Sequence, residues 1–230
     1  MKIIGVLGGL GPQATIDFEL RLHQAAQRLV PQHSNSGYPK LYVYYHRQPP
    51  FIMADERTPV FPLQADPDLL EAAGWLGSRC DFLVITANGP HMVQQQIEEA
   101  AGCPILSMID ATLDEVKRRG WRKIGVLGFG DPSVPVYGQP LSLLNLAVET
   151  VTPELQGRLN AVIGAFQEGV ENERSIQAVR DALAHLREKF VDGIILGCTE
   201  LPLLLHESAD TANLINPAQL LAEAAVKRAL

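Results

Sequence analysis

Ile3-Ile4-Gly5-Val6-Leu7-Gly8 opens the chain as an apolar run, and roughly 120 residues later the run recurs as Lys123-Ile124-Gly125-Val126-Leu127-Gly128. A second pair follows in the same order, because Phe82-Leu83-Val84-Ile85-Thr86-Ala87-Asn88 is echoed by Gly193-Ile194-Ile195-Leu196-Gly197-Cys198-Thr199. Each run ends in small residues, which is typical of a buried strand turning into a helix. Any two such units look alike, but two pairs in one order favour a duplicated fold with two similar lobes.

Outside these runs, short apolar segments alternate with segments of helical periodicity, which indicates βαβ units around parallel sheets. The pattern predicts strands over 3–7, 41–45, 82–86, 105–109, 124–127, 149–151, 193–196 and 214–215. It predicts helices over 15–29, 67–80, 93–100, 111–119, 156–168, 175–190 and 217–228. The expected fold is α/β, with two pseudosymmetric lobes that are each a parallel sheet flanked by helices. Residues 1–115 and 213–230 should form the N-terminal lobe, and residues 116–212 the C-terminal lobe.

Composition excludes several functions. A net charge of −7 gives no basic footprint for nucleic acid, and the apolar stretches are too short to cross a bilayer. No leader pattern precedes the first strand, so we expect a cytoplasmic protein. The three cysteines form no CxxC pair and the six histidines are scattered, so neither a disulfide framework nor a metal site is expected.

Small and polar residues gather where the predicted strands end, at 8–12, 87–91, 128–132 and 197–200. In open parallel sheets, ligands bind beyond the carboxyl ends of the strands. If the lobes face each other about a pseudo-twofold axis, Ala87 and Cys198 lie on opposite sides of one cleft. We expect the active site in that cleft.

Cys198 follows a strand and precedes a predicted helix. Backbone N–H groups at a helix start stabilise a thiolate, so the position predicts a base or a nucleophile. The alternative is a structural thiol, since free cysteine is among the most buried residue types. Cys80 and Cys103 lie at element ends and are interpreted as packing residues.

The glycine turn after the first strand resembles a phosphate loop, but it matches neither GxGxxG nor GxxxxGK[ST]. Pro12 also has no N–H to offer. Backbone at Leu10 and Gly11, with the Thr15 hydroxyl, therefore suits a small anion such as a substrate carboxylate. A tight turn without a ligand is the alternative.

Asn88 and Thr199 occupy corresponding places in the two repeats, directly after Ala87 and Cys198. Their amide and hydroxyl groups could grip a carboxylate from both lobes. Either residue could equally cap a helix, and capping does not exclude binding.

Three further side chains have both a functional and a structural interpretation. His91 could orient the site, although a lone histidine is more often a hydrogen-bonded structural residue. Arg57 lies on the proline-rich loop 48–66 and could clamp a carboxylate, or form a solvated ion pair. Glu200 could orient or protonate the Cys198 thiol, or simply complement a helix dipole.

Together these motifs resemble the aspartate/glutamate racemase family. Residues 8–15, GGLGPQAT, are similar to its GGMGPxAT opening, and residues 197–200, GCTE, match its second catalytic motif. Residues 107–112 and the 55–58 turn resemble further family segments. The resemblance implies cofactor-independent stereoinversion at the α-carbon of an amino acid or small carboxylate, by cysteine-mediated proton transfer and without pyridoxal phosphate. A homodimer is expected.

The first family motif, CNT with a following His, is altered to Ala87-Asn88-Gly89-Pro90-His91. Alanine carries no proton, so the symmetric two-thiol mechanism cannot operate. Three hypotheses remain. Cys198 serves one face while water, Thr86 or another group serves the other; the chain is a one-base decarboxylase or isomerase; or it is a silent carboxylate-binding relative.

Overall fold

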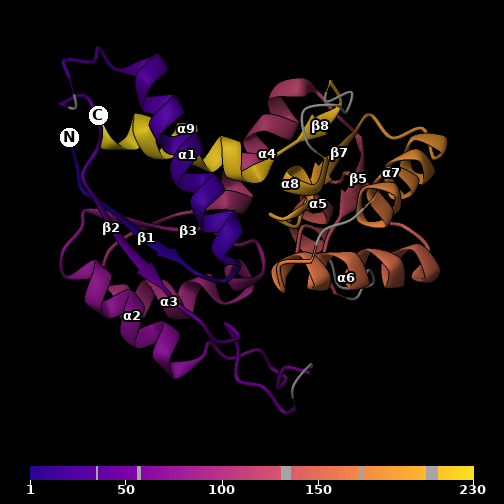
Figure 1. Ribbon diagram of the computed structural model, residues 1–230, viewed down its shortest axis with the longest axis horizontal. Helices are drawn as coiled ribbons and strands as arrows, with labels where there is room; N and C mark the ends of the chain where they lie inside the picture. The colour runs from indigo at the N-terminus through magenta and orange to yellow at the C-terminus, as the bar shows by residue number, and fades with distance from the viewer. Residues whose placement is uncertain (35, 56–57, 131–135, 171–172, 206–211) are drawn as a thin grey trace. The chain divides into compact units, whose positions relative to one another are not determined.

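The computed structural model describes residues 1–34, 36–55, 58–130, 136–170, 173–205 and 212–230. The chain divides into two compact units, Met1–Met108 with Ala218–Leu230, and Ile109–Pro217. Each unit contains one four-stranded parallel sheet flanked by helices (Figure 1). The predicted α/β fold class is therefore confirmed. The first unit breaks off at Met108, which is the first residue of the helix α4 (Met108–Arg119).

The first unit has the strand order β2-β1-β3-β4. Its strands are β1 (Ile4–Gly8), β2 (Leu41–Tyr45), β3 (Phe82–Ile85) and β4 (Ile105–Leu106). Its helices are α1 (Pro12–Leu29), α2 (Pro67–Gly77), the 3-10 helix η1 (Gly89–Val93), α3 (Gln94–Ala101) and α9 (Pro217–Ala229). One core joins α1 and α9 to one face of the sheet, and a second core joins α2 and α3 to the other (Figure 1).

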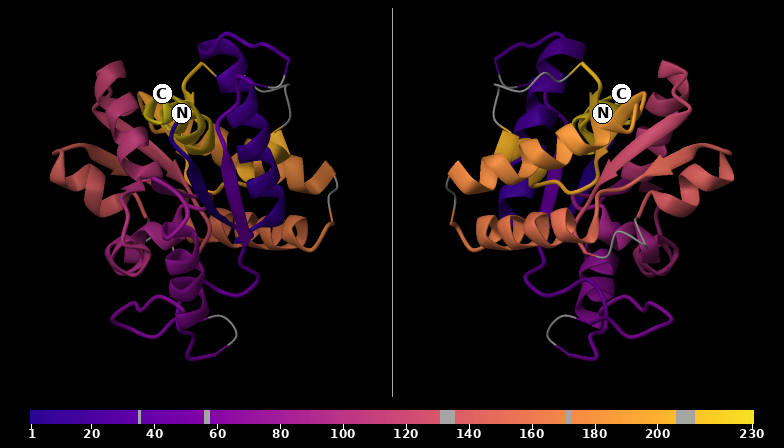
Figure 2. Two further views of the ribbon diagram at one scale, coloured as in Figure 1. Left: turned by 90° about the vertical axis from the view of Figure 1, so that its left-hand side faces the viewer. Right: turned by 90° about the vertical axis from the view of Figure 1, so that its right-hand side faces the viewer.

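The second unit has the order β6-β5-β7-β8. Its strands are β5 (Lys123–Leu127), β6 (Ala147–Glu149), β7 (Gly193–Leu196) and β8 (Leu214–Ile215). Its helices are α4 (Met108–Arg119), α5 (Gly138–Leu143), α6 (Pro153–Gln167), α7 (Glu173–Glu188) and α8 (Leu201–Leu205). The helices α6 and α7 lie side by side (Figure 2), and with α8 they bury one apolar cluster against β5 and β7.

The two sheets repeat one topology. In both, the first strand of the unit is central and pairs with the second and third, and the third pairs with the fourth. Leu7 of β1 pairs with Ile85 of β3, and Leu127 of β5 pairs with Leu196 of β7. The strand pairing thus aligns the two repeats residue by residue, in the same alignment as the sequence.

Beyond the last paired residues the repeat continues through the backbone. The Thr86 N–H donates to the Leu7 carbonyl at 3.2 Å, and the Gly197 N–H donates to the carbonyl of the corresponding leucine at 2.6 Å. Ala87 and Cys198 follow these bonds directly. They are therefore equivalent positions at the carboxyl edges of their sheets.

Several features differ from the sequence-based prediction, including β6, which was predicted over 149–151, and the helix α8, whose range was not predicted. The predicted strand 105–109 pairs only through Ile105 and Leu106, because α4 already begins at Met108. Ser107 before this helix and Asp110 in its first turn are residue types that favour a helix start over a strand. The short helix α5 was not predicted.

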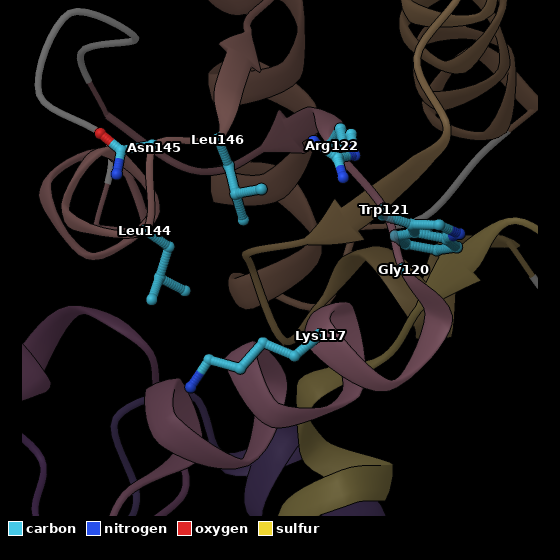
Figure 3. Close-up of a pocket in the computed structure, with 7 residues that line it drawn as sticks. All are labelled: Lys117, Gly120, Trp121, Arg122, Leu144, Asn145 and Leu146. Carbon is cyan, nitrogen blue, oxygen red and sulfur yellow. The ribbon is translucent and has the colours of Figure 1, made fainter.

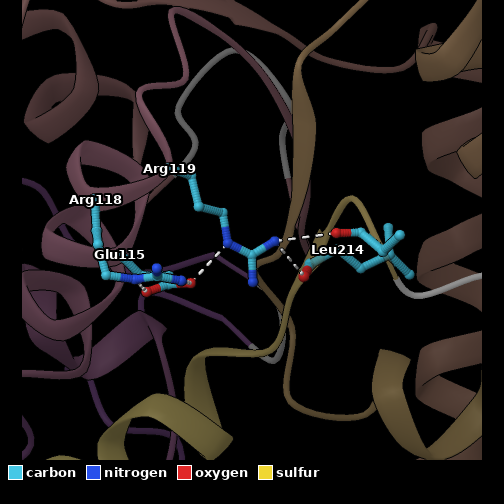
Figure 4. A network of polar contacts seen from close by, with 5 residues as sticks. Glu115, Arg118, Arg119 and Leu214 are labelled. Atoms are coloured by element: carbon cyan, nitrogen blue, oxygen red, sulfur yellow. Dashed lines mark hydrogen bonds and ion pairs between the residues drawn. The ribbon is translucent and has the colours of Figure 1, made fainter.

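A charged network ties α4 to the strand β8 (Figure 4). Glu115 accepts hydrogen bonds from Arg118 and from Arg119, and Arg119 also donates to the carbonyl groups of Ala212 at 3.2 Å and Leu214 at 3.5 Å. The Arg118 hydrogen bonds, and then those of Arg119, lower the pKa of Glu115 to about 2. The carboxylate therefore orients the two guanidinium groups in this corner of the unit.

We predict that Glu115→Gln removes an acid-dependent contribution to stability of about 1 kcal/mol, a value kept small because solvent screens the pair. The depressed pKa gives stability that is present above about pH 4.5 and is lost as the pH falls toward about 2. Urea unfolding should therefore separate wild type from variant by more at pH 7 than at pH 3.5, and by least near pH 2. Asp114→Asn is the control, and an equal loss at both pH values would contradict the prediction.

Candidate active site

Cys198 lies two residues beyond the end of β7 and is 7% exposed. Its Sγ donates a hydrogen bond to Oε2 of Glu200 at 3.0 Å. Burial, and then the Glu200 charge, raise the pKa of the Cys198 thiol well above its ordinary value, against a weaker opposing hydrogen bond from the Glu200 backbone. The sequence predicted a thiolate at this position, whereas burial and the Glu200 charge favour the protonated thiol.

The Glu200 carboxylate is held from both sides. Its Oε2 also accepts from the Thr199 hydroxyl at 3.2 Å, and its Oε1 accepts from Nε2 of Gln167 at 3.0 Å. Glu200 is 2% exposed, so these contacts replace the water that a surface carboxylate would have. Glu200 thus orients the thiol, and the Thr199 hydroxyl is hydrogen-bonded to the same carboxylate.

At the corresponding edge of the first unit, the organising side chain is Thr15. Its Oγ1 accepts from the Gly9 N–H at 2.9 Å and lies 2.9 Å from the Thr86 hydroxyl. Gly9 has a φ of 82°, and a Cβ there would meet the backbone oxygen of His46 at 2.4 Å. Only glycine therefore fits this turn, which packs directly against the end of β2.

Leu10 and Gly11 form the entry to α1. Leu10 is half-buried against the apolar cluster beneath α2 and α3. Gly11 is the N-cap of α1, with a φ of 115° and no side-chain cap. The first turn of an 18-residue helix thus offers its backbone amides at this edge without a capping side chain.

The His91 ring holds the segment that contains Ala87 through hydrogen bonds. Its Nδ1 lies 3.0 Å from the Ala87 carbonyl, and its Nε2 accepts from the Met108 N–H at 3.1 Å. Because Nε2 is an acceptor, the geometry assigns a neutral ring with the proton on Nδ1. Burial lowers the pKa of His91 to about 4, so the ring stays neutral and holds the turn.

At the carboxyl edge of the sheet in the first unit, which we call the first edge, the residues after β3 have small side chains. Ala87 is 9% exposed and Asn88 is 4% exposed. A Cβ placed at Gly89 meets none of the described atoms within 4 Å, so this position has open space in front of it. The structure thus shows room for a larger side chain at residue 89.

Two polar atoms near this edge were missed by sequence reasoning. Nε2 of His46 and Oε1 of Gln13 are buried and have no hydrogen-bond partner among the described residues, although Nε2 lies 3.7 Å from Oδ1 of Asp66. Burying such an atom unpaired costs roughly 1–3 kcal/mol, which favours a ligand-binding edge over a purely structural one. The positions of these two residues in the sequence could have indicated them, since His46 directly follows β2 and Gln13 lies in the first turn of α1.

The turn after β5 is held by α6. Gln156 donates to the Gly128 carbonyl at 2.9 Å, and Asn160 bonds both the N–H and the carbonyl of Gly130 at 3.0 Å. Phe129 between them is 58% exposed. The second unit therefore fixes its first turn with side-chain amides, where the first unit uses a threonine.

Some residues that the sequence analysis considered lie outside the described part of the chain. Arg57, and the residues Asp131 and Pro132 after the β5 turn, lie outside the described residues. Nearby, the Thr58 N–H donates to Oδ1 of Asp55 at 2.8 Å, which closes a turn. Within the described ranges, no group of three His, Cys, Asp or Glu residues could hold a metal ion. In the same part of the chain, no helix combines the length and apolarity needed to span a membrane.

Comparison with known proteins identifies the family. Residues 7–225 match the Asp/Glu/Hydantoin racemase family, and the chain belongs to it. RacX of Bacillus subtilis (strain 168), a broad specificity amino-acid racemase, is 24% identical over 226 residues, which is 97% of this chain and 96% of that protein.

Solved structures agree with this assignment. A putative Asp/Glu racemase from Yersinia pestis is 25% identical, with a TM-score of 0.75 over 100% of this chain and 99% of that chain. The aspartate racemase of Picrophilus torridus shares the fold with a TM-score of 0.79 at 20% identity, over 100% of this chain and 94% of that one.

We predict that Glu200→Gln speeds the alkylation of Cys198 by iodoacetamide about tenfold at pH 8, because loss of the nearby negative charge lowers the thiol pKa and increases the thiolate fraction. Mass spectrometry of the peptide containing Cys198 measures the rate. Cys80, whose pKa is raised to about 12 mainly by burial, serves as the slow internal reference. Glu154→Gln, on the exposed start of α6, is the matched control. An unchanged or slower rate in Glu200→Gln would show that the carboxylate does not hold the thiol protonated.

Proposed function

We propose that this racemase-family chain transfers a proton at the α-carbon of an amino acid or small carboxylate, with Cys198 serving one face and without pyridoxal phosphate. The observation that carries the proposal is the 3.0 Å hydrogen bond from Cys198 to a buried, fixed carboxylate. A protonated thiol held in one orientation is suited to act as a general acid. The names of the relatives, RacX and the Asp/Glu racemases, support an amino-acid substrate.

The local hydrogen bonds favour proton donation over proton removal. As an acid, the thiol gives its proton to the α-carbanion and becomes a thiolate. As a base, it would first pass this proton to Glu200 and then take the α-proton onto sulfur. Donation needs no such prior transfer, because the raised pKa of Cys198 keeps the sulfur protonated at the start. Cys198 should therefore work best in the donating direction.

The opposite face of the α-carbon needs a second group. Strand pairing makes Ala87 the position equivalent to Cys198, and the alanine side chain has no acidic or basic group. The neighbouring Thr86 is 2% exposed and its hydroxyl contacts the Thr15 hydroxyl at 2.9 Å, not a basic group. An alcohol without a neighbouring base is a poor proton acceptor, so we assign the second role to solvent water or to another group rather than to Thr86.

We place the substrate carboxylate at the first edge. The uncapped first turn of α1, with the Leu10 and Gly11 backbone before it, supplies N–H groups and the positive end of a helix dipole. Asn88, at 4% exposure, lies on the same edge as a further polar group. Orientation by fixed groups supplies a large part of the barrier reduction in such reactions.

A one-base decarboxylase or isomerase is the second candidate, and one specific observation favours it. Protonation of an enediolate left by carbon dioxide loss needs a single acid on one face, and the structure provides one buried thiol and an alanine at the repeated position. Racemisation needs a group on each face. A malonate panel therefore separates the two candidates by release of carbon dioxide.

We expect the wild type to exchange the α-proton of at least one amino acid in heavy water, and Cys198→Ser to reduce the rate by about 100-fold or more. NMR loss of the α-proton signal, with chiral chromatography of the same samples, measures exchange and inversion separately. Equal exchange by both proteins would reject the role of Cys198. Binding of amino acids by calorimetry without exchange, and without carbon dioxide release from malonates, would favour the silent carboxylate-binding relative.

Restoring the family residues should raise racemisation. In Ala87→Cys with Gly89→Thr, a thiol returns to the position equivalent to Cys198, and the open space at residue 89 accommodates the added side chain. We predict an increase in the inversion rate of about tenfold or more, because a thiol then supplies the second acid–base group. Ala87→Ser with Gly89→Thr is the matched control. Equal inversion rates in the two double variants would contradict a two-sided role for these positions.

A further inference from the structure

A pocket lies in the second unit (Figure 3), and Cys198 is not among the residues that line it. Its volume is about 470 Å³, within the range of small-molecule sites. It is bordered by the end of α4, the residues before β5 and the turn that leads into β6. In these parallel strands it lies at the amino edge, whereas Cys198 follows the carboxyl end of β7. Occupation of this pocket therefore does not compete with binding at Cys198.

The pocket is next to the most basic segment of an acidic chain. Residues 117–123, KRRGWRK, hold five of the 19 lysine and arginine residues, although the net charge is −7. Four of the five have carboxylate partners that do not line the pocket, since Arg118 and Arg119 bind Glu115, Lys123 binds Glu149 and Lys117 contacts Asp114. Of the five, Lys117 and Arg122 line the pocket.

These two cations are only weakly neutralised. Lys117 contacts Asp114 at 3.3 Å, but both side chains are more than half exposed, so solvent screens the pair. Asp192 lies near Arg122, and its carboxylate accepts from the backbone N–H groups of Arg122 and Lys123. The Arg122 side chain is exposed and is drawn at the pocket wall (Figure 3).

The rest of the pocket is apolar. Leu144 and Leu146 are half-buried and project into the space between the turn and α4 (Figure 3). The Trp121 indole forms the adjoining wall, where the Arg119 guanidinium lies 4.8 Å from its ring. A Cβ at Gly193 would meet this indole at 2.1 Å, so the ring is seated against β7 and is not free to swing away.

We propose that this pocket binds a small organic anion, with a phosphate or carboxylate group held by Lys117 and Arg122 and an apolar ring against Leu144, Leu146 and Trp121. Charge-assisted hydrogen bonds fix the anionic group, and burial of the ring adds apolar contact. The site is independent of the proton-transfer function proposed above.

The basic segment also has a structural explanation, which the experiment must distinguish from ligand binding. Cations in the last turn of a helix stabilise its dipole, and α4 ends in Lys117, Arg118 and Arg119. Helix stabilisation requires only that a cation be present in that turn. Ligand binding requires the cations that line the pocket, so Arg118, which belongs to the same turn but does not line it, is the matched control.

The experiment uses tryptophan fluorescence. The chain has two tryptophans, so Trp75→Phe leaves Trp121 as the reporter in the pocket wall. Phenyl phosphate and benzoate carry both ring and charge, inorganic phosphate carries charge only, and phenol carries a ring only. We expect saturable quenching by phenyl phosphate or benzoate, and Kd values for inorganic phosphate and for phenol that are about tenfold weaker or more.

In the same background, Lys117→Gln with Arg122→Gln should weaken the Kd of the ring-bearing anion by about tenfold, while Arg118→Gln changes it by less than about twofold. The preferred probe tells whether the anionic group is a phosphate or a carboxylate. Thermal unfolding and α-proton exchange without ligand should match between the double variant and Arg118→Gln. Three results would overturn the proposal. The two variants could weaken the Kd equally, inorganic phosphate could bind as tightly as phenyl phosphate, or no probe could give saturable quenching.

Discussion

Parallel pairing of each unit's first and third strands is the constraint on which the rest of the site depends. The bond from the Thr86 N–H to Leu7, and its counterpart from the Gly197 N–H to Leu127, extend that pairing one residue past the strands. The next residue is then fixed at the carboxyl edge, where parallel sheets place their functional groups. Because the bond uses only backbone atoms, it leaves the side chains of Ala87 and Cys198 free to diverge while their positions are kept.

The two edges have diverged in their electrostatics. In the first unit, the hydroxyls of Thr15 and Thr86 and the neutral ring of His91 hold the edge together without a formal charge. In the second unit, a buried carboxylate organises the edge and keeps Cys198 protonated. A buried charge is tolerated only where several donors satisfy it, which explains why Gln167 and Thr199 both turn toward Glu200.

Much of the fold could be predicted from the sequence, because buried parallel strands are short apolar runs and the duplication shows each run twice. The prediction was wrong where two signals overlapped, as at 105–109, where apolar residues continue past Ser107 into α4. The equivalence of Ala87 and Cys198 could also be predicted, since it follows from register. The raised pKa of the Cys198 thiol could not be predicted, because it depends on burial and on the carboxylate of Glu200, which turns toward Sγ and is held by Gln167, 33 positions away from it in the chain. His46 was missed for a related reason, since nothing local shows that its Nε2 is buried without a partner.

The loss of symmetry has a chemical consequence that follows from these contacts. A pair of equivalent thiols can exchange roles, so that each donates in one direction and accepts in the other. In the second unit, the thiol at the repeated position donates to the buried Glu200 carboxylate, whereas the repeated position of the first unit is alanine, which has no acid–base group. Under the proposed function, proton donation by Cys198 and proton removal from the opposite face of the carbon are therefore assigned to different kinds of group. The proposed reaction then has unequal rates in its two directions, or protonates only one face of the carbon.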